Sequence, residues 1–191
     1  MEIEFIEEGH LYLVDGVITP SVSEILKFIF PNKYTNIPRS ILDQKAEFGT
    51  HIHQAIEDYE SGSGYQLTAL ELVVFEQYLK LKKRYDIQPI SQEEIVAYGY
   101  EYCGRLDMTA FVDGVESLVD IKTTAQLDHE SLAWQLGMYQ LALGKVFARC
   151  YCVWLPKKDI GRLVEIKVKS KEEILEMLKR FKEYRLNASN S

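Results

Sequence analysis

Two aspartates that could share a metal ion lie on neighbouring segments of the chain. Residues 104–112 and 115–123 are rich in β-branched and apolar side chains, and Asp113-Gly114 separates them. An Asp-Gly pair between two such runs is the strongest local signal for a β-hairpin with a two-residue turn. In the register that this turn sets, Asp107 directly faces Asp120.

The same register places Arg105 opposite Lys122, and strand alternation puts both on the side of the ribbon that carries the two aspartates. Opposed carboxylates repel, so something must compensate the pair, and a hard divalent cation does this well. Mg²⁺ is typically held by one or two carboxylates together with water and phosphate oxygens. In the alternative interpretation, Arg105 and Lys122 simply neutralise two exposed aspartates. Apolar neighbours on both sides of Asp120 favour a central strand, where a buried carboxylate needs a partner.

A second set of polar side chains occurs on two expected helices. Gly49, His53 and Glu57 are spaced four residues apart and therefore share one helix face. A glycine inside a helix costs about 1 kcal/mol relative to alanine, which suggests close approach of a backbone or a ligand. A lone helical histidine such as His51 is usually a surface residue.

The remaining pattern predicts one domain of alternating strands and helices. Ser21 and Glu24 form a capping box, and Asp128 caps a helix on which Gln135 and Tyr139 lie one turn apart. The expected elements are strands at 2–6 and 11–14, helices from Ser21 to Pro31, at 38–59 and at 67–84, a strand at 93–98, the hairpin, a helix from Asp128 to Leu143, strands at 147–155 and 163–168, and a helix at 171–187.

Composition indicates an ordinary globular protein of 191 residues, with 47% hydrophobic and 27% charged residues. No apolar run approaches the roughly 20 residues needed to span a bilayer, and no signal peptide is visible. Cys103, Cys150 and Cys152 lack the spacing of a zinc site, so we expect a reducing, cytoplasmic setting without a membrane. A net charge of -7 argues against a non-specific nucleic-acid binder, although basic residues cluster locally.

Together these features resemble the PD-(D/E)XK nuclease superfamily, and within it the RecB-like, phage-type exonuclease branch. A similarity to phage and mitochondrial genome-maintenance exonucleases extends over His10-x-Tyr12, Gly16 and residues 20–26. The iron–sulfur cysteines of some members are missing, so we expect no iron–sulfur cluster. The matching motifs, in family order, are Gly49 to His53, Gly104-Arg105-Leu106-Asp107, Asp120-Ile121-Lys122-Thr123 and Gln135-Leu136-Gly137-Met138-Tyr139.

The resemblance implies an α/β fold with a central mixed β-sheet flanked by helices, the restriction-endonuclease-like core. It implies one nuclease domain over 1–191, with an N-terminal hairpin and helix at 1–37, a catalytic core at 38–170 and a C-terminal helix at 171–187. It also implies one or two Mg²⁺ or Mn²⁺ ions. The ions would be held by His53, Asp107, Asp120 and the carbonyl of Ile121, with Lys122 acting on the attacking water and Arg105, Thr123, Gln135 and Tyr139 contacting the substrate.

Glu57 and either Glu93 or Glu94 are candidates for support around the metal. The expected activity is metal-dependent exonuclease digestion of DNA in phage or prophage recombination or repair, in the cytoplasm of a bacterial or phage-infected cell. Expected partners are DNA and a single-strand annealing or binding protein, and a homo-oligomer is compatible with the family. Two alternatives stay open at this point: a structure-specific or single-strand endonuclease of the same superfamily, and a catalytically silent nucleic-acid-binding module.

Overall fold

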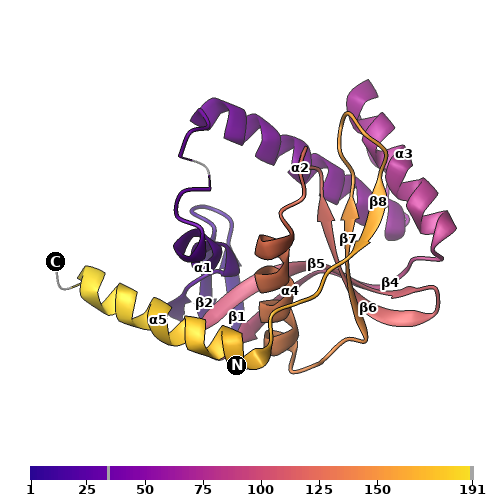
Figure 1. Cartoon of the computed structure of the whole chain (residues 1–191). Coiled ribbons are helices and arrows are strands. Elements are labelled where there is room, and N and C mark those ends of the chain that lie inside the picture. The colour runs from indigo at the N-terminus through magenta and orange to yellow at the C-terminus, as the bar shows by residue number, and fades with distance from the viewer. Residues whose placement is uncertain (34, 190–191) are drawn as a thin grey trace.

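The computed structural model describes residues 1–33 and 35–189, which form an α/β fold around a mixed five-stranded sheet (Figure 1). Neighbouring strands are antiparallel except for β6 and β7, which are parallel. This arrangement confirms the expected mixed sheet flanked by helices. In spatial order the strands are β4 (Gln88–Tyr98), β5 (Tyr102–Val112), β6 (Val115–Lys122), β7 (Arg149–Trp154) and β8 (Arg162–Glu165).

The expected hairpin joins β5 to β6. Asp113 and Gly114 both have positive φ, +48° and +77°, as a primed turn requires, and Val112 pairs with Val115. The predicted register holds up to the pair Met108 and Val119.

Beyond that pair, however, the expected hairpin pairs are not formed. The strands separate there, so the predicted pairing of Asp107 with Asp120, and of Arg105 with Lys122, is wrong. The physical reason is a side-chain contact, because the Ile121 amide donates to the Asp107 carboxylate at 2.6 Å instead of to the β5 backbone.

The parallel pairing of β6 and β7 depends on a helical crossover. Helix α4 (His129–Leu143) makes this connection. It begins where the Ser131 amide donates to Asp128 and ends at Gly144, whose φ of +61° is left-handed. Both termini agree with the sequence-based prediction.

Helices cover both faces of the sheet. One face packs against α1 (Val22–Ile29), α4 and α5 (Lys171–Ser189), and the opposite face packs against α2 (Arg39–Glu60) and α3 (Ala69–Arg84). The capping box of α1 is formed as predicted, since Glu24 and Ser21 exchange backbone-to-side-chain hydrogen bonds. Within the described ranges, none of the helices is both long and apolar enough to cross a lipid bilayer.

The N-terminal region forms a small separate sheet. It contains β1 (Ile3–Ile6), β2 (Leu11–Val14) and β3 (Val17–Thr19), all antiparallel, so the expected hairpin has a third strand. A bridge between Ser21 and Cys103 connects this region to β5, next to a hydrogen bond from the Cys103 amide to the Pro20 carbonyl. The small sheet therefore lies beside the first half of β5.

Candidate functional site

Strands β4 and β5 are both irregular where they lie side by side, at Glu93 on β4 and at Asp107 on β5. Glu93 has a φ of +49°, a left-handed value that is rare for a residue with a side chain, and it lies between two residues that pair regularly with β5. On β5, Leu106 and Met108 pack in core clusters on opposite faces of the sheet, although residues two apart in a strand normally share a face. The alternation is therefore interrupted at Asp107, and such irregularities often occur beside functional sites.

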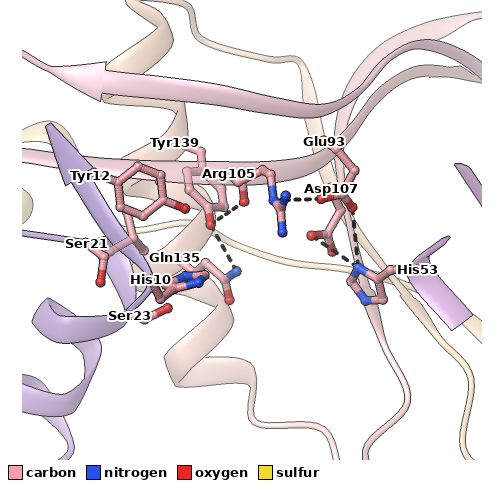
Figure 2. A pocket seen from close by; sticks show the side chains of 12 residues that line it. His10, Tyr12, Ser21, Ser23, His53, Glu93, Arg105, Asp107, Gln135 and Tyr139 are labelled. Atoms are coloured by element: carbon pink, nitrogen blue, oxygen red, sulfur yellow. Dashed lines mark hydrogen bonds and ion pairs between the residues drawn. The ribbon is translucent and has the colours of Figure 1, made fainter. Parts of the chain in front are cut away.

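At this level three potential metal ligands converge (Figure 2). His53 on α2 places its Nδ1 atom 3.6 Å from Asp107 Oδ1 and 3.7 Å from Glu93 Oε1, and all three ligand atoms lie within 4.8 Å of one another. Each side chain is mostly buried, with 25% exposure for His53, 20% for Glu93 and 11% for Asp107. We call His53, Glu93 and Asp107 the acidic cluster.

The orientation of His53 is set by the backbone of β6. Its Nε2–H group donates to the Ile121 carbonyl at 3.1 Å, which directs Nδ1 toward the two carboxylates. Histidines that bind metals are commonly held by such a second hydrogen bond. Burial lowers the pKa of His53, but the Asp107 and Glu93 carboxylates outweigh it and raise that pKa above the ordinary value.

Asp107 links the acidic cluster to β6. Its Oδ2 atom accepts the hydrogen bond from the Ile121 amide, whereas Oδ1 faces His53. The carbonyl of Ile121, predicted as a metal ligand, accepts a hydrogen bond from His53. Ile121 therefore holds both Asp107 and His53 in place through its two backbone groups.

Asp120 and Lys122 form a separate pair beside the acidic cluster. Asp120 is 1% exposed, and Lys122 Nζ lies 2.8 Å from its Oδ1 and 2.7 Å from its Oδ2. Only the contact to Oδ1 has hydrogen-bond geometry, so the buried Oδ2 atom has no hydrogen-bond partner among the described residues. Burial raises the pKa of Asp120 despite the nearby ammonium group, and the charge of Asp107 adds to that rise.

For Lys122, burial and the neighbouring carboxylates shift the pKa in opposite directions. Burial alone would lower the pKa of Lys122, but the Asp120 and Asp107 carboxylates raise it above the ordinary value. Lys122 is thus a cation held beside two acids, at the end of β6 where the sheet opens.

Arg105, Gln135 and Tyr139 lie together on the other side of the acidic cluster. Arg105 Nε is 3.0 Å from Glu93 Oε2, and the Tyr139 hydroxyl donates to the Arg105 carbonyl at 2.9 Å. The Gln135 amide nitrogen lies 3.5 Å from the Tyr139 hydroxyl. Gly104 packs directly against Tyr139, where a Cβ atom would meet the ring at 2.7 Å. The structure therefore brings these three predicted residues close to Asp107.

A cavity of about 180 Å³ joins this group to the acidic cluster (Figure 2). Asp120, Ile121, Lys122 and Thr123 do not line it. Its lining residues include Glu93, Arg105, Asp107, Gln135 and Tyr139, together with His10, Tyr12, Ser21 and Ser23 from the N-terminal region.

The N-terminal lining residues were not predicted as site residues, and only the similarity over His10-x-Tyr12 and residues 20–26 pointed to them. Glu93 was predicted as an outer residue, although it belongs to the acidic cluster itself.

Several other predicted residues take structural roles or lie outside the cavity. His51 bonds Glu71 at 2.9 Å, in agreement with its interpretation as a surface residue, and Glu57 accepts a hydrogen bond from Gln54. Gly49 does not make the expected close approach, because a Cβ atom there would meet only the Thr123 hydroxyl, at an ordinary 3.5 Å. The three cysteines are free thiols in the core.

Comparison with known proteins adds information about the fold only. No family model matches the chain, and no curated protein matches it. Among solved structures, one described as "Crystal structure of SSO0001" is similar, with a TM-score of 0.50 and 15% sequence identity. The similarity covers 84% of this chain and 73% of that chain. At this level of identity the likeness concerns the architecture alone.

Proposed function

We propose that this protein is a metal-dependent deoxyribonuclease of the PD-(D/E)XK type that hydrolyses phosphodiester bonds at DNA ends. The observation that carries the proposal is the acidic cluster, in which one imidazole nitrogen and two carboxylates converge within 4.8 Å. Beside it, Asp120 has a buried oxygen without a hydrogen-bond partner among the described residues. That oxygen lies 2.7 Å from the Lys122 ammonium group without hydrogen-bond geometry, so it keeps a lone pair that suits a metal ion.

The donor set suits Mg²⁺ or Mn²⁺, which prefer carboxylate oxygens and, for Mn²⁺, accept imidazole nitrogen. His53, Asp107 and Asp120 would hold the ion, and Glu93 would join them. When bound, the ion polarises a phosphate oxygen and lowers the pKa of a bound water. Lys122, fixed beside Asp120 at 2.8 Å, would orient the attacking water and offset charge that develops on the phosphate.

The choice of an exonuclease acting on DNA in phage or prophage recombination or repair rests on the resemblance of the motifs. The same resemblance supports a single-strand annealing or binding protein as a partner. An endonuclease of the same superfamily would use the same residues. A silent binding module is disfavoured, because it has no need of the polar trio Asp107, Asp120 and Lys122, of which Asp120 is buried.

The test is digestion of end-labelled linear DNA beside its covalently closed circular form, with Mg²⁺, with Mn²⁺ and with chelator. We expect loss of the linear substrate alone, and only with metal. Asp120→Asn and Lys122→Ala should abolish cleavage while the far-ultraviolet circular dichroism spectrum stays unchanged. Asp159→Asn is a matched control, because Asp159 is an exposed aspartate that pairs with Arg162 away from the cavity.

The outcomes separate the candidate functions. Cutting of the circle would establish an endonuclease. Binding of DNA without cutting of either form would favour the silent module. Full activity in Asp120→Asn would overturn the site assignment.

A further inference from the structure

The outer face of the small N-terminal sheet carries apolar side chains that no other described segment covers. Ile6 pairs with Leu11, and Leu13 pairs with Ile18, so these four side chains lie next to one another on one face. Ile6, Leu11 and Ile18 are 42%, 40% and 63% exposed. None of the four belongs to a core cluster of the described residues. We call Ile6, Leu11, Leu13 and Ile18 the outer sheet face.

This face is uncommon because the opposite face of the same sheet is apolar as well. Tyr12 and Val14 alternate with the outer residues on β2 and are buried in a minor core cluster. An antiparallel sheet that packs on one side normally presents polar residues to water on the other. A contiguous exposed apolar patch is typical of a contact with another protein. The outer sheet face therefore indicates a binding surface.

The small sheet is also the acidic part of the molecule. Residues 1–19 contain five Asp and Glu residues and no Lys or Arg, so they contribute -5 to the net charge of -7. Glu4 lies on the same face as Leu13, directly opposite it, and Glu7 and Glu8 follow immediately after β1. Such a surface repels nucleic acid and favours a partner that is both apolar and basic.

The end of helix α5 has the complementary character. Residues 179–186 contain four basic residues and a single acid, Glu183. Lys179, Lys182 and Leu186 are three and four residues apart, so they share one face of the helix. The Lys179 and Lys182 side chains are 73% and 64% exposed, and Leu186 is 61% exposed. We call Lys179, Lys182 and Leu186 the basic helix face, and Figure 1 shows this end of α5 projecting past the other elements.

The two surfaces are neighbours on the same chain. A hollow of about 330 Å³ is lined by Pro20, which comes directly after β3, and by Lys182 and Leu186 of the basic helix face. The helix of the same chain nevertheless leaves most of the outer sheet face exposed. With complementary surfaces side by side, two copies related by a twofold axis can make both contacts at once, and such closed dimers are the commonest oligomers.

We propose that this protein forms a twofold dimer in which the outer sheet face of each copy packs on the basic helix face of the other. The apolar side chains of the two faces meet at the centre of each contact, and the acids of the sheet lie against Lys179 and Lys182. The inference goes beyond the proposed nuclease function and does not depend on it, because no residue of the acidic cluster belongs to either face.

The test measures the mass of the protein in solution by sedimentation equilibrium and reverses the charges of one face at a time. The sheet variant combines Glu4→Lys with Glu7→Lys, and the helix variant combines Lys179→Glu with Lys182→Glu. Either variant alone opposes like charges at both contacts, whereas a heterodimer of the two variants has opposite charges at both.

A matched control reverses two charges elsewhere on the surface. It combines Asp43→Lys with Glu47→Lys, because both acids are exposed on α2, outside the two faces. Thermal melting verifies that each variant folds.

We expect the wild type and the α2 control to have twice the 22.1 kDa mass of one chain. The sheet variant and the helix variant should each raise the dissociation constant of the dimer about a hundredfold, because like charges across an interface repel. An equimolar mixture of the two should recover the dimer. A wild type that is monomeric at every concentration would overturn the proposal, as would a mixture that stays monomeric or variants that dimerise like the wild type. None of these outcomes depends on the cleavage assay with Asp120→Asn.

Discussion

Gly104 is the glycine of the candidate site that has no room for a side chain. A Cβ atom at this position would lie 2.7 Å from Cε1 of Tyr139 and 3.0 Å from Cγ2 of Val22. Non-bonded carbons have their best contact at about 3.5–4.0 Å, so the methyl group of Gly104→Ala would overlap both neighbours. Neither can move freely, because Tyr139 is 5% exposed and Val22 is 2% exposed.

The cost of Gly104→Ala can be worked out from these contacts. Overpacking a well-filled core costs about 1–3 kcal/mol. Moving the Tyr139 ring also weakens its hydroxyl bond to the Arg105 carbonyl, which adds about 0.5–1.5 kcal/mol. Replacing glycine in a strand returns about 0.5–1 kcal/mol of chain entropy. We therefore expect the free energy of unfolding to fall by about 0.5–4 kcal/mol.

Urea denaturation at equilibrium measures this change, with an unchanged m-value as the sign that only stability has altered. Gly49→Ala is the matched control, because a methyl group there makes an ordinary 3.5 Å contact inside helix α2. It should raise the free energy of unfolding by about 0.5–1 kcal/mol. Combining Gly104→Ala with Tyr139→Leu should cost less than the sum of the single changes. A Gly104→Ala protein as stable as wild type would refute the reasoning.

Two further predictions concern metal binding and acid stability. Mg²⁺ at about 100 times its dissociation constant should stabilise the wild type by about 2.7 kcal/mol, and Asp120→Asn should lose this gain, as thermal melting with and without chelator would show. Hydrogen bonds from the Thr68 amide and hydroxyl lower the pKa of Glu71 from 4.5 to about 2. The ionised Glu71 carboxylate therefore stabilises the fold fully above the unfolded-state pKa, and this stabilisation is lost as the pH falls toward about 2. Glu71→Gln should therefore destabilise the protein more at neutral pH than at about pH 3 in urea titrations, and an equal loss at both would contradict this role.

The parts of the fold that could be predicted depend on local signals. The Asp113-Gly114 turn, the capping box at Ser21 and the helix cap at Asp128 are each specified by residues close in sequence, and each is formed. The opposition of Asp107 and Asp120 was extrapolated from the turn, and it fails because a side-chain contact replaces the backbone ladder.

The site depends more on contacts between distant segments. The left-handed φ of Glu93 has no local sequence signal, since glutamate does not favour this conformation, and only the approach of α2 with His53 makes its carboxylate part of the acidic cluster. The cavity wall that carries His10 and Tyr12 exists because the small N-terminal sheet packs beside β5. No periodicity or motif spacing encodes the docking of one such unit on another.

That small N-terminal sheet also has a consequence for the dynamics of the protein. It is attached to the main sheet through a minor core cluster of Tyr12, Val14, Ala97 and Cys103, whereas the five-stranded sheet is held by two large clusters. Units with less buried apolar surface open at lower free energy, and amide hydrogen exchange detects such opening. The wall that carries His10 and Tyr12 should therefore exchange faster than the strands of the acidic cluster, so that the cavity could open on this side while His53, Glu93 and Asp107 stay assembled.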